Sequence, residues 1–199
     1  MKKIEMAVLS IVFFVLCAAP SVSYAVDTVR YEVIGGDTLV ISGTGETGSI
    51  ADFNDKIKNN KEKVKESNIR TLIIKEGITK ISTQPRELSH LERIVFPDSL
   101  VEIAENAFLS SNCLEEVVFG KNLRKVGYGA FASCENLRQI VLPNSVTEIG
   151  SRAFESCSRL NRIVLPASLS SWNVNVVQNC PALREVVNNS QLSCKIPWY

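Results

Sequence analysis

The side chains that most often do chemistry are scarce in this sequence. His90 is the single histidine, so one chain cannot assemble a Ser-His-Asp triad or a metal site built from several histidines. We expect His90 in a surface loop. Two carboxylates would suffice for a glycosidase, and the candidate acids are Glu102 with Glu148 and Glu115 with Glu116. A carboxylate-based hydrolase is the weakest function considered, and we predict no enzyme, no cofactor and no metal site.

Cysteine is the other reactive residue type, with six copies in the sequence. Cys134, Cys157 and Cys180 recur at an interval of 23 residues, while Cys113 and Cys194 fall outside that series. Neighbouring strands lie about 4.8 Å apart, a separation that a disulfide accepts, so bonds between successive repeats are one interpretation. Metal binding by thiolates would want Cys-x-x-Cys spacing, which is absent. Cysteine is also among the most often buried residues, and we predict buried free thiols for the three in series.

The elements that must position these side chains belong to an internal repeat. Leu91, Leu114, Leu137, Leu160 and Leu183 stand 23 residues apart. Other apolar residues return at fixed offsets in columns, which are Ile94, Val117, Ile140, Ile163 and Val186; Phe96, Phe119, Leu142 and Leu165; Leu100, Leu123, Val146, Leu169 and Leu192; and Phe108, Phe131, Phe154 and Val177. A period of about 20 to 29 residues that opens Leu-x-x-Ile-x-Leu is typical of leucine-rich repeats.

The repeat predicts an α/β, β-rich solenoid with parallel strands. One coil cannot bury its apolar edge alone, so the coils stack and bury a continuous ladder. We place the repeats at residues 69–199, with coils that start at residues 69, 91, 114, 137 and 160 and a C-terminal cap from residue 183.

The repeat also resembles a known family. Residues 137–157 read Leu-x-x-Ile-x-Leu-Pro-x-Ser-Val-x-x-Ile-Gly-x-x-Ala-Phe-x-x-Cys, which is similar to the BspA-like, or treponemal-type, leucine-rich repeats of bacterial proteins. The resemblance covers residues 69 to about 187, and residues 36–45 resemble the hairpin that opens many members. It implies a secreted or surface-displayed binding protein, often an adhesin for host matrix proteins or other cells, and no catalysis.

The N-terminal part of the chain predicts export and then a cap. Residues 1–25 have the form of a secretory signal peptide, with cleavage after Ala25 and lipidation at Cys17 as the less favoured alternative. The apolar run is shorter than the roughly 20 residues that a spanning helix needs, so we expect no integral membrane segment in the mature protein. Residues 26–68 are predicted to form the cap, with a β-hairpin at 29–42 and a helix from Ile50 to about Ser67.

Charge excludes one class of partner. Cleavage after Ala25 removes Lys2, Lys3 and Glu5 and leaves equal numbers of basic and acidic residues. A nucleic-acid partner would demand a concentrated footprint of Lys and Arg. We therefore predict no nucleic-acid partner.

The exposed face of the sheet is the predicted binding site. Strand residues alternate faces, so the residue between the buried Ile and Leu of each repeat points outward. These outward residues are Ile73, Val95, Val118, Val141, Val164 and Val187, and the column two places earlier includes Arg93, Glu116, Gln139 and Arg162. An apolar stripe with a polar rim is typical of a protein-binding patch. Strand propensity, with cross-strand pairs Arg93–Glu116 and Arg162–Glu185, explains the same residues without a partner.

These observations lead to a functional hypothesis with one rival from another class. The leading hypothesis is a secreted, periplasmic or surface-displayed non-enzymatic protein that holds a protein ligand, from host matrix or cell envelope, on the sheet face. The rival is a structural envelope module that associates with copies of itself.

Overall fold

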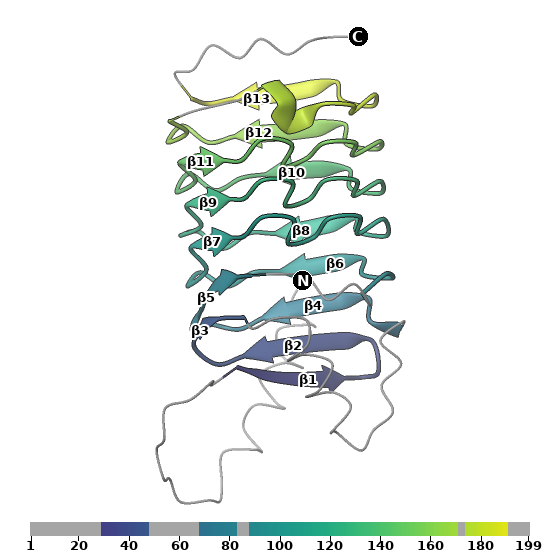
Figure 1. Cartoon of the computed structure of the whole chain (residues 1–199), viewed down its shortest axis with the longest axis vertical. Helices are drawn as coiled ribbons and strands as arrows, with labels where there is room; N and C mark the ends of the chain where they lie inside the picture. Colours follow the sequence, from purple (N-terminus) through teal and green to yellow (C-terminus); the bar gives the residue numbers. More distant parts are fainter. Residues whose placement is uncertain (1–28, 48–67, 83–87, 171–173, 191–199) are drawn as a thin grey trace, which may run out of the picture.

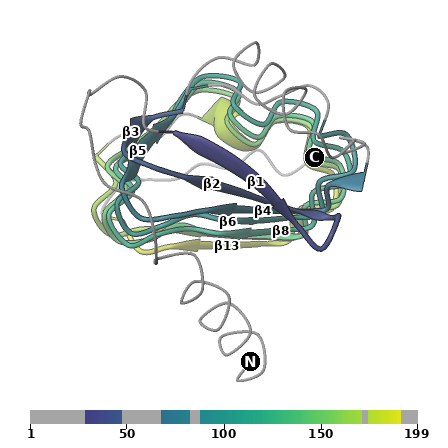
Figure 2. The same cartoon turned by 90° about the horizontal axis from the view of Figure 1, so that it is seen from below.

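The structure is a computed structural model that describes residues 29–47, 68–82, 88–170 and 174–190. These residues form a β-solenoid, in which the chain winds into coils that stack along one axis (Figure 1). Seen along that axis, successive strands lie over one another and outline the same coil (Figure 2). Stacking follows from the repeat, because each coil leaves an apolar edge that the next coil covers.

One side of the solenoid carries what we call the front strands. They run parallel, except that β1 and β2 at the N-terminal end are antiparallel to each other. The front strands are β1 (Arg30–Ile34), β2 (Thr38–Ser42), β4 (Thr71–Ile74), β6 (Arg93–Val95), β8 (Glu116–Val118), β10 (Gln139–Val141), β12 (Arg162–Leu165) and β13 (Glu185–Asn188).

A second sheet forms another side of the coils. Its strands are short and parallel, and they stack in the order β11-β9-β7-β5-β3. They are β3 (Gly45–Glu46), β5 (Ile78–Ile81), β7 (Glu102–Ile103), β9 (Lys125–Val126) and β11 (Glu148–Ile149).

The register of the strands equals the length of the repeat. Ile94 lies beside Val117 in the front strands, and Ile103 lies beside Val126 in the second sheet. Because the offset in pairing is one repeat, residues of one sequence column become neighbours up the stack. The predicted columns are therefore the ladders of the core.

Phenylalanine forms the bulkiest of these ladders. The rings of Phe108 and Phe131 are stacked with centroids 5.2 Å apart, and those of Phe131 and Phe154 with centroids 5.6 Å apart. All three side chains are buried, and Val177 continues the column in the 3-10 turn η2 (Val174–Val177). Burying a side chain of this size stabilises a fold by about 1.5–3 kcal/mol.

The structure corrects the predicted class. The described residues are a β-solenoid without an α-helix, since their helical content is limited to 3-10 turns such as η2. The predicted hairpin is present as β1 and β2, and β2 pairs parallel with β4, so the hairpin extends the front ladder beyond the first coil. The helix predicted over residues 50–67 lies outside the described residues, as do the signal peptide, Cys17, Cys194 and residues 191–199 of the C-terminal cap.

The ladder of front strands is interrupted at one junction. Strands β1-β2-β4-β6-β8 form one sheet and β10-β12-β13 another, and β8 does not pair with β10 although both lie within the described residues. Figure 1 shows the wider space between the arrows of β8 and β10. The second sheet passes the same level unbroken, because β9 pairs with β11. The two coils are thus joined at the back and separated at the front.

Candidate protein-binding face

The predicted outward residues form a stripe on the front strands, in two runs on either side of the junction between β8 and β10. The registers place Ile73 beside Val95, Val95 beside Val118 and Val141 beside Val164. Val118 and Val141 are the most open members, with 37% and 51% of their surface exposed. The remaining members, Ile73, Val95, Val164 and Val187, are half-buried. The stripe is therefore apolar along its length and most accessible at its centre.

Ion pairs flank the stripe where the sequence predicted them. Arg93 Nε donates to Glu116 Oε2 at 2.7 Å, and Arg162 Nε lies 3.1 Å from Glu185 Oε2. Gln139 stands between these two pairs in the same column and carries no charge. Exposed pairs of this kind contribute about 0–1 kcal/mol to stability, so they arrange the rim of the stripe more than they hold the fold.

A cavity opens in the stripe where the front ladder is interrupted. It has a volume of about 380 Å³ and is lined by Glu115, Glu116, Val117, Arg138, Gln139, Val141 and Asn161. Glu115, Glu116 and Val117 come from the coil of β8, and the other residues come from the coils of β10 and β12. Val117 and Phe119 are only partly buried, whereas Ile140 and Leu142, their equivalents one coil later, are buried.

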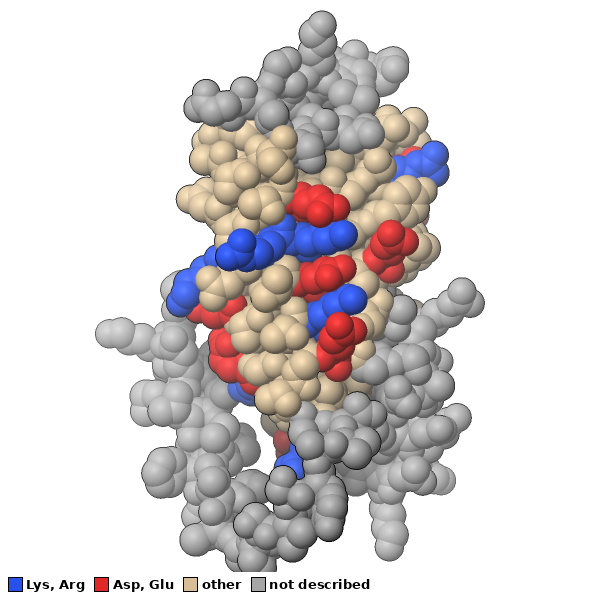
Figure 3. Space-filling model, turned by 60° about the vertical axis from the view of Figure 1, so that its left-hand side comes forward, with Lys and Arg blue, Asp and Glu red and all other residues tan. Residues whose placement is uncertain are grey.

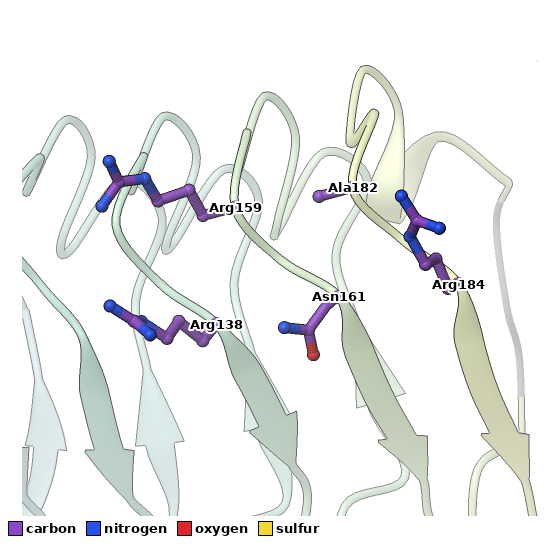
Figure 4. Close-up of a pocket in the computed structure, with 5 residues that line it drawn as sticks. All are labelled: Arg138, Arg159, Asn161, Ala182 and Arg184. Carbon is purple, nitrogen blue, oxygen red and sulfur yellow. The ribbon is translucent and has the colours of Figure 1, made fainter.

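A cluster of arginines adjoins this cavity. Arg138, Arg159 and Arg184, with Asn161 and Ala182, line a second hollow of about 410 Å³. Figure 4 shows the three arginines and Asn161 near the ends at which β10, β12 and β13 begin. None of the three guanidinium groups forms an ion pair with a described residue. Guanidinium groups suit carboxylate, phosphate and sulfate oxygens, so this end of the face favours anionic groups.

The second sheet presents a different kind of surface. Figure 3 brings forward the side on which Figure 1 places β5 to β11, and basic and acidic side chains alternate along it. Lys80 lies 3.6 Å from Glu46 and 3.9 Å from Glu102, and Lys125 lies 3.3 Å from Glu148. Charges that pair with one another in this way form a solvated face.

The candidate acids lie on two different parts of the surface. Glu102 and Glu148 lie on β7 and β11, with β9 between them, and each faces a lysine. Glu115 and Glu116 both line the cavity at the interruption, and Glu116 also forms an ion pair with Arg93. His90 is exposed and its Nδ1 lies 3.0 Å from the hydroxyl of Ser89. Within the described ranges no group of three or more His, Cys, Asp or Glu side chains lies close enough to hold a metal ion.

The serial cysteines bond to the backbone of the phenylalanine column. The thiols of Cys134 and Cys157 donate to the carbonyl oxygens of Phe108 and Phe131, each at 3.3 Å. Burial raises the pKa of Cys134 to about 12, so its thiol stays protonated at neutral pH. The prediction of buried free thiols is confirmed for these two residues. Cys180 is also free, and it is only partly buried.

Neither the arginine cluster nor the cavity beside it was predicted from the sequence. Part of the arginine cluster is visible in the sequence. The column that follows each repeat-starting leucine changes from acidic to basic or neutral residues and reads Glu92, Glu115, Arg138, Asn161 and Arg184. Arg159 belongs to a different column, and the turn between coils brings it beside Arg138. Beside the interruption between β8 and β10 the sequence departs from the repeat at Gly120, which stands where three other coils have proline.

Comparisons with known proteins agree with this architecture. Residues 79–194 match the family model described as a BspA type leucine-rich repeat region, in six copies. No helix among the described residues has the length and apolar content that a membrane crossing requires. No curated protein matches the sequence.

Solved structures of bacterial leucine-rich repeat proteins are similar to the chain. A leucine-rich repeat protein of T. pallidum is 25% identical with a TM-score of 0.61, over 81% of this chain and 79% of that one. A leucine-rich cell surface protein of Faecalibacterium prausnitzii is 23% identical with a TM-score of 0.59, over 84% of this chain and 39% of that one. A leucine-rich repeat protein of Bacteroides ovatus is 21% identical with a TM-score of 0.58, over 83% and 47%.

The chain spans less than half the length of the last two proteins, and these likenesses concern the fold. The family model, in contrast, matches more than half of the chain and covers every coil from β5 to β13. The chain belongs to the BspA-type leucine-rich repeat family.

Proposed function

We propose that this protein is a secreted or surface-displayed binding protein without enzymatic activity, which holds a protein partner on its front strands. The binding residues are Ile73, Val95, Val118, Val141, Val164 and Val187 of the stripe, with Arg93, Glu116, Gln139 and Arg162 at its rim. The observation that best supports this proposal is the exposure of Val118 and Val141 on neighbouring coils. Families of bacterial surface repeats support such a role in adhesion or protein interaction.

The stripe has the composition of a recognition surface. Large exposed valines at the centre of a sheet lose contact with water when a partner covers them, which favours association. The arginine cluster and the cavity lie at the same place, so charge and shape add specificity beside the apolar contact. The second sheet lacks such a combination, because its charges pair with one another.

The test is a pair of charge substitutions on the stripe. Val118→Glu and Val141→Glu together should abolish capture of the partner from host matrix or cell-envelope extract, because they place two carboxylates at the centre of the contact. The matched control is Val101→Glu, since Val101 is 40% exposed and precedes β7 of the second sheet. Unchanged capture by a folded double variant would refute the site.

The wild type and the double variant also distinguish self-association from binding of a foreign partner. Light scattering at increasing concentration measures the mass of the wild type and of the double variant. A wild type that stays monomeric supports a foreign partner, whereas a dimer that the double variant abolishes would assign the stripe to contacts between copies.

Export is tested separately. We infer that residues 1–25 direct secretion, so the mature protein should begin at Val26. N-terminal sequencing of the protein isolated outside the cytoplasm checks this cleavage site.

A further inference from the structure

Within the described residues, the interruption between β8 and β10 leaves several backbone groups without a hydrogen-bond partner. At the other front junctions, an amide at or just before each strand donates to the carbonyl of the preceding coil, as Glu115 and Glu116 do to Glu92 at 2.8 and 3.1 Å. One repeat later, Arg138 and Gln139 form no such bond with Glu115. The amide of Phe119 and the carbonyl of Val141 also stay apart, whereas Phe96 donates to Val118 at 2.9 Å one repeat earlier.

Both sides of the opening therefore present donors and acceptors. The coil of β8 offers the carbonyl of Glu115 and the amide of Phe119, and the coil of β10 offers the amides of Arg138 and Gln139 and the carbonyl of Val141. These are the groups through which a parallel neighbour is held at the closed junctions. Unpaired backbone groups along a strand edge are a template for another extended chain.

One residue of the β8 coil packs differently from its equivalents in other coils. Gly120 takes the place of Pro97, Pro143 and Pro166 in the other coils, and a Cβ on Gly120 would overlap the carbonyl oxygen of Pro97. The coil of β8 therefore sits closely on the coil of β6, and Phe119 stacks on Phe96 with centroids 5.8 Å apart. At the back, Phe131 donates its amide to Ala153 at 2.8 Å and keeps the next coil in place.

We propose that the opening between β8 and β10 binds an extended peptide segment of the protein partner by strand addition. This inference rests on the proposed function and names the chemistry of the partner. The segment forms backbone hydrogen bonds with one or both edges. Its charges complement the walls, with a basic side chain towards Glu115 and an acidic side chain towards Arg138, which line the cavity without an ion pair to each other.

The first test uses a strand sequence that this fold already accepts. The probe is a fluorescein-labelled synthetic peptide with the sequence of residues 160–167, which contains β12, the natural parallel neighbour of β10. The control peptide carries Val164→Pro, because proline lacks the amide that a ladder requires. Fluorescence anisotropy should show binding of the probe and an affinity about tenfold or more weaker for the control. Equal affinities, or no binding of either peptide, would overturn the proposal.

A cross-link supplies a test on the protein itself. Val118→Cys with Val141→Cys places a thiol on each side of the opening, and a disulfide there would draw β8 and β10 together. The control is Lys125→Cys with Glu148→Cys, which links the same two coils through β9 and β11 of the second sheet, away from the stripe. The probe should bind the oxidised control and lose at least about tenfold in affinity for the oxidised clamp, with recovery on reduction. Full affinity for the oxidised clamp would refute the site.

Amide hydrogen exchange tests whether the probe binds in the opening even if the disulfide of the Val118→Cys, Val141→Cys double variant does not form. The amides of Phe119, Arg138 and Gln139 should exchange faster than their equivalents Phe96, Glu115 and Glu116, and the probe should slow them. Protection of these amides before the probe is added, or none after it binds, would overturn the proposal.

The two proposals fail in different ways. If the glutamates at Val118 and Val141 abolish capture of the partner and the oxidised clamp does not, the stripe is the site and strand addition is wrong. If the probe protects the opening but the glutamates leave capture unchanged, the opening stands and the stripe does not.

Discussion

The ring of Phe131 stacks on the ring of Phe154 with centroids 5.6 Å apart and planes 10° from parallel, across the junction at which β8 and β10 do not pair. The ring of Phe119 meets Phe131 edge-on at 6.0 Å. The core is therefore continuous through a level at which the front ladder is not. Much of the cohesion between these two coils depends on Phe131.

Replacing Phe131 by alanine should destabilise the whole array. The side chain is fully buried and contacts rings on both neighbouring coils, and truncation of a buried phenylalanine typically costs about 3–5 kcal/mol. We expect Phe131→Ala to unfold the protein or to shorten its cooperative unit. Thermal unfolding followed by circular dichroism measures the loss.

The matched control lies in the same column near the C-terminal end. Val177 is buried with fewer coils beyond it, so Val177→Ala should lower the melting temperature only slightly. Equal losses for the two variants would show that stability is not concentrated at the central coil.

Gly120 should not tolerate a side chain. In Gly120→Ala the new Cβ overlaps the backbone of Pro97, which cannot rotate away as a side chain would. We expect a loss of about 3 kcal/mol in the free energy of unfolding, at the upper end of the range for overpacking. Chemical denaturation measures the loss. Gly36→Ala is the comparison, because open space surrounds that position and the cost there is limited to about 1–2 kcal/mol for a side chain at a positive φ. An equal effect of both substitutions would contradict the close approach.

The free thiols should differ in reactivity. A hydrogen bond from Cys157 lowers the pKa of Cys180, which is also partly exposed, whereas Cys134 is buried and its pKa is raised. Thiolate is the reactive form. Alkylation by iodoacetamide at neutral pH, followed by mass spectrometry, should therefore modify Cys180 well before Cys134. Similar rates in denaturant provide the control, and similar rates in the folded protein would contradict the assigned burial.

Alkaline pH should weaken the fold through Cys134. Its pKa rises from 9.0 to about 12 on folding, so between these values the unfolded chain loses a proton that the folded chain keeps. The contribution of the protonated Cys134 thiol to the free energy of unfolding is complete below pH 9, falls as pH rises and is lost above about pH 12. Between these values the free energy of unfolding falls by at most about 1.4 kcal/mol per pH unit. Cys134→Ala should show a shallower fall between pH 8 and pH 11 in chemical denaturation. Identical slopes would mean that Cys134 titrates normally in the folded protein.

The sequence predicted the ladders because both of its signals are local and periodic. An interval of 23 residues sets the register, so Ile94 beside Val117 and Phe131 beside Phe154 follow from the pattern alone. The two cross-strand pairs, Arg93–Glu116 and Arg162–Glu185, also follow from that register. The observed contacts confirm these predictions. They could be made from sequence because each depends only on which residues become neighbours.

The interruption could not be predicted in this way. Val117 and Ile140 occupy the same column and suit a paired strand equally well. Their coils differ in backbone approach, since Gly120 lies against the carbonyl of Pro97, and the polarity pattern of a sequence does not encode such contacts. The arginine cluster was missed for a related reason, since Arg138 and Arg159 meet only after a turn has closed. The role of the stripe in binding stays a prediction.

The open junction also gives the stack a mechanical direction. A solenoid whose coils are hydrogen-bonded on every side resists bending in every direction. Here the second sheet and the phenylalanine column hold the two coils together, while β8 and β10 are not bonded, so this junction can act as a hinge. Bending that spreads the front costs no backbone hydrogen bonds at that level, whereas bending that spreads the back must break the pairing of β9 with β11. The curvature of the front strands therefore changes at the junction of β8 and β10. A rigid partner longer than a few coils meets two rigid segments joined by one flexible junction.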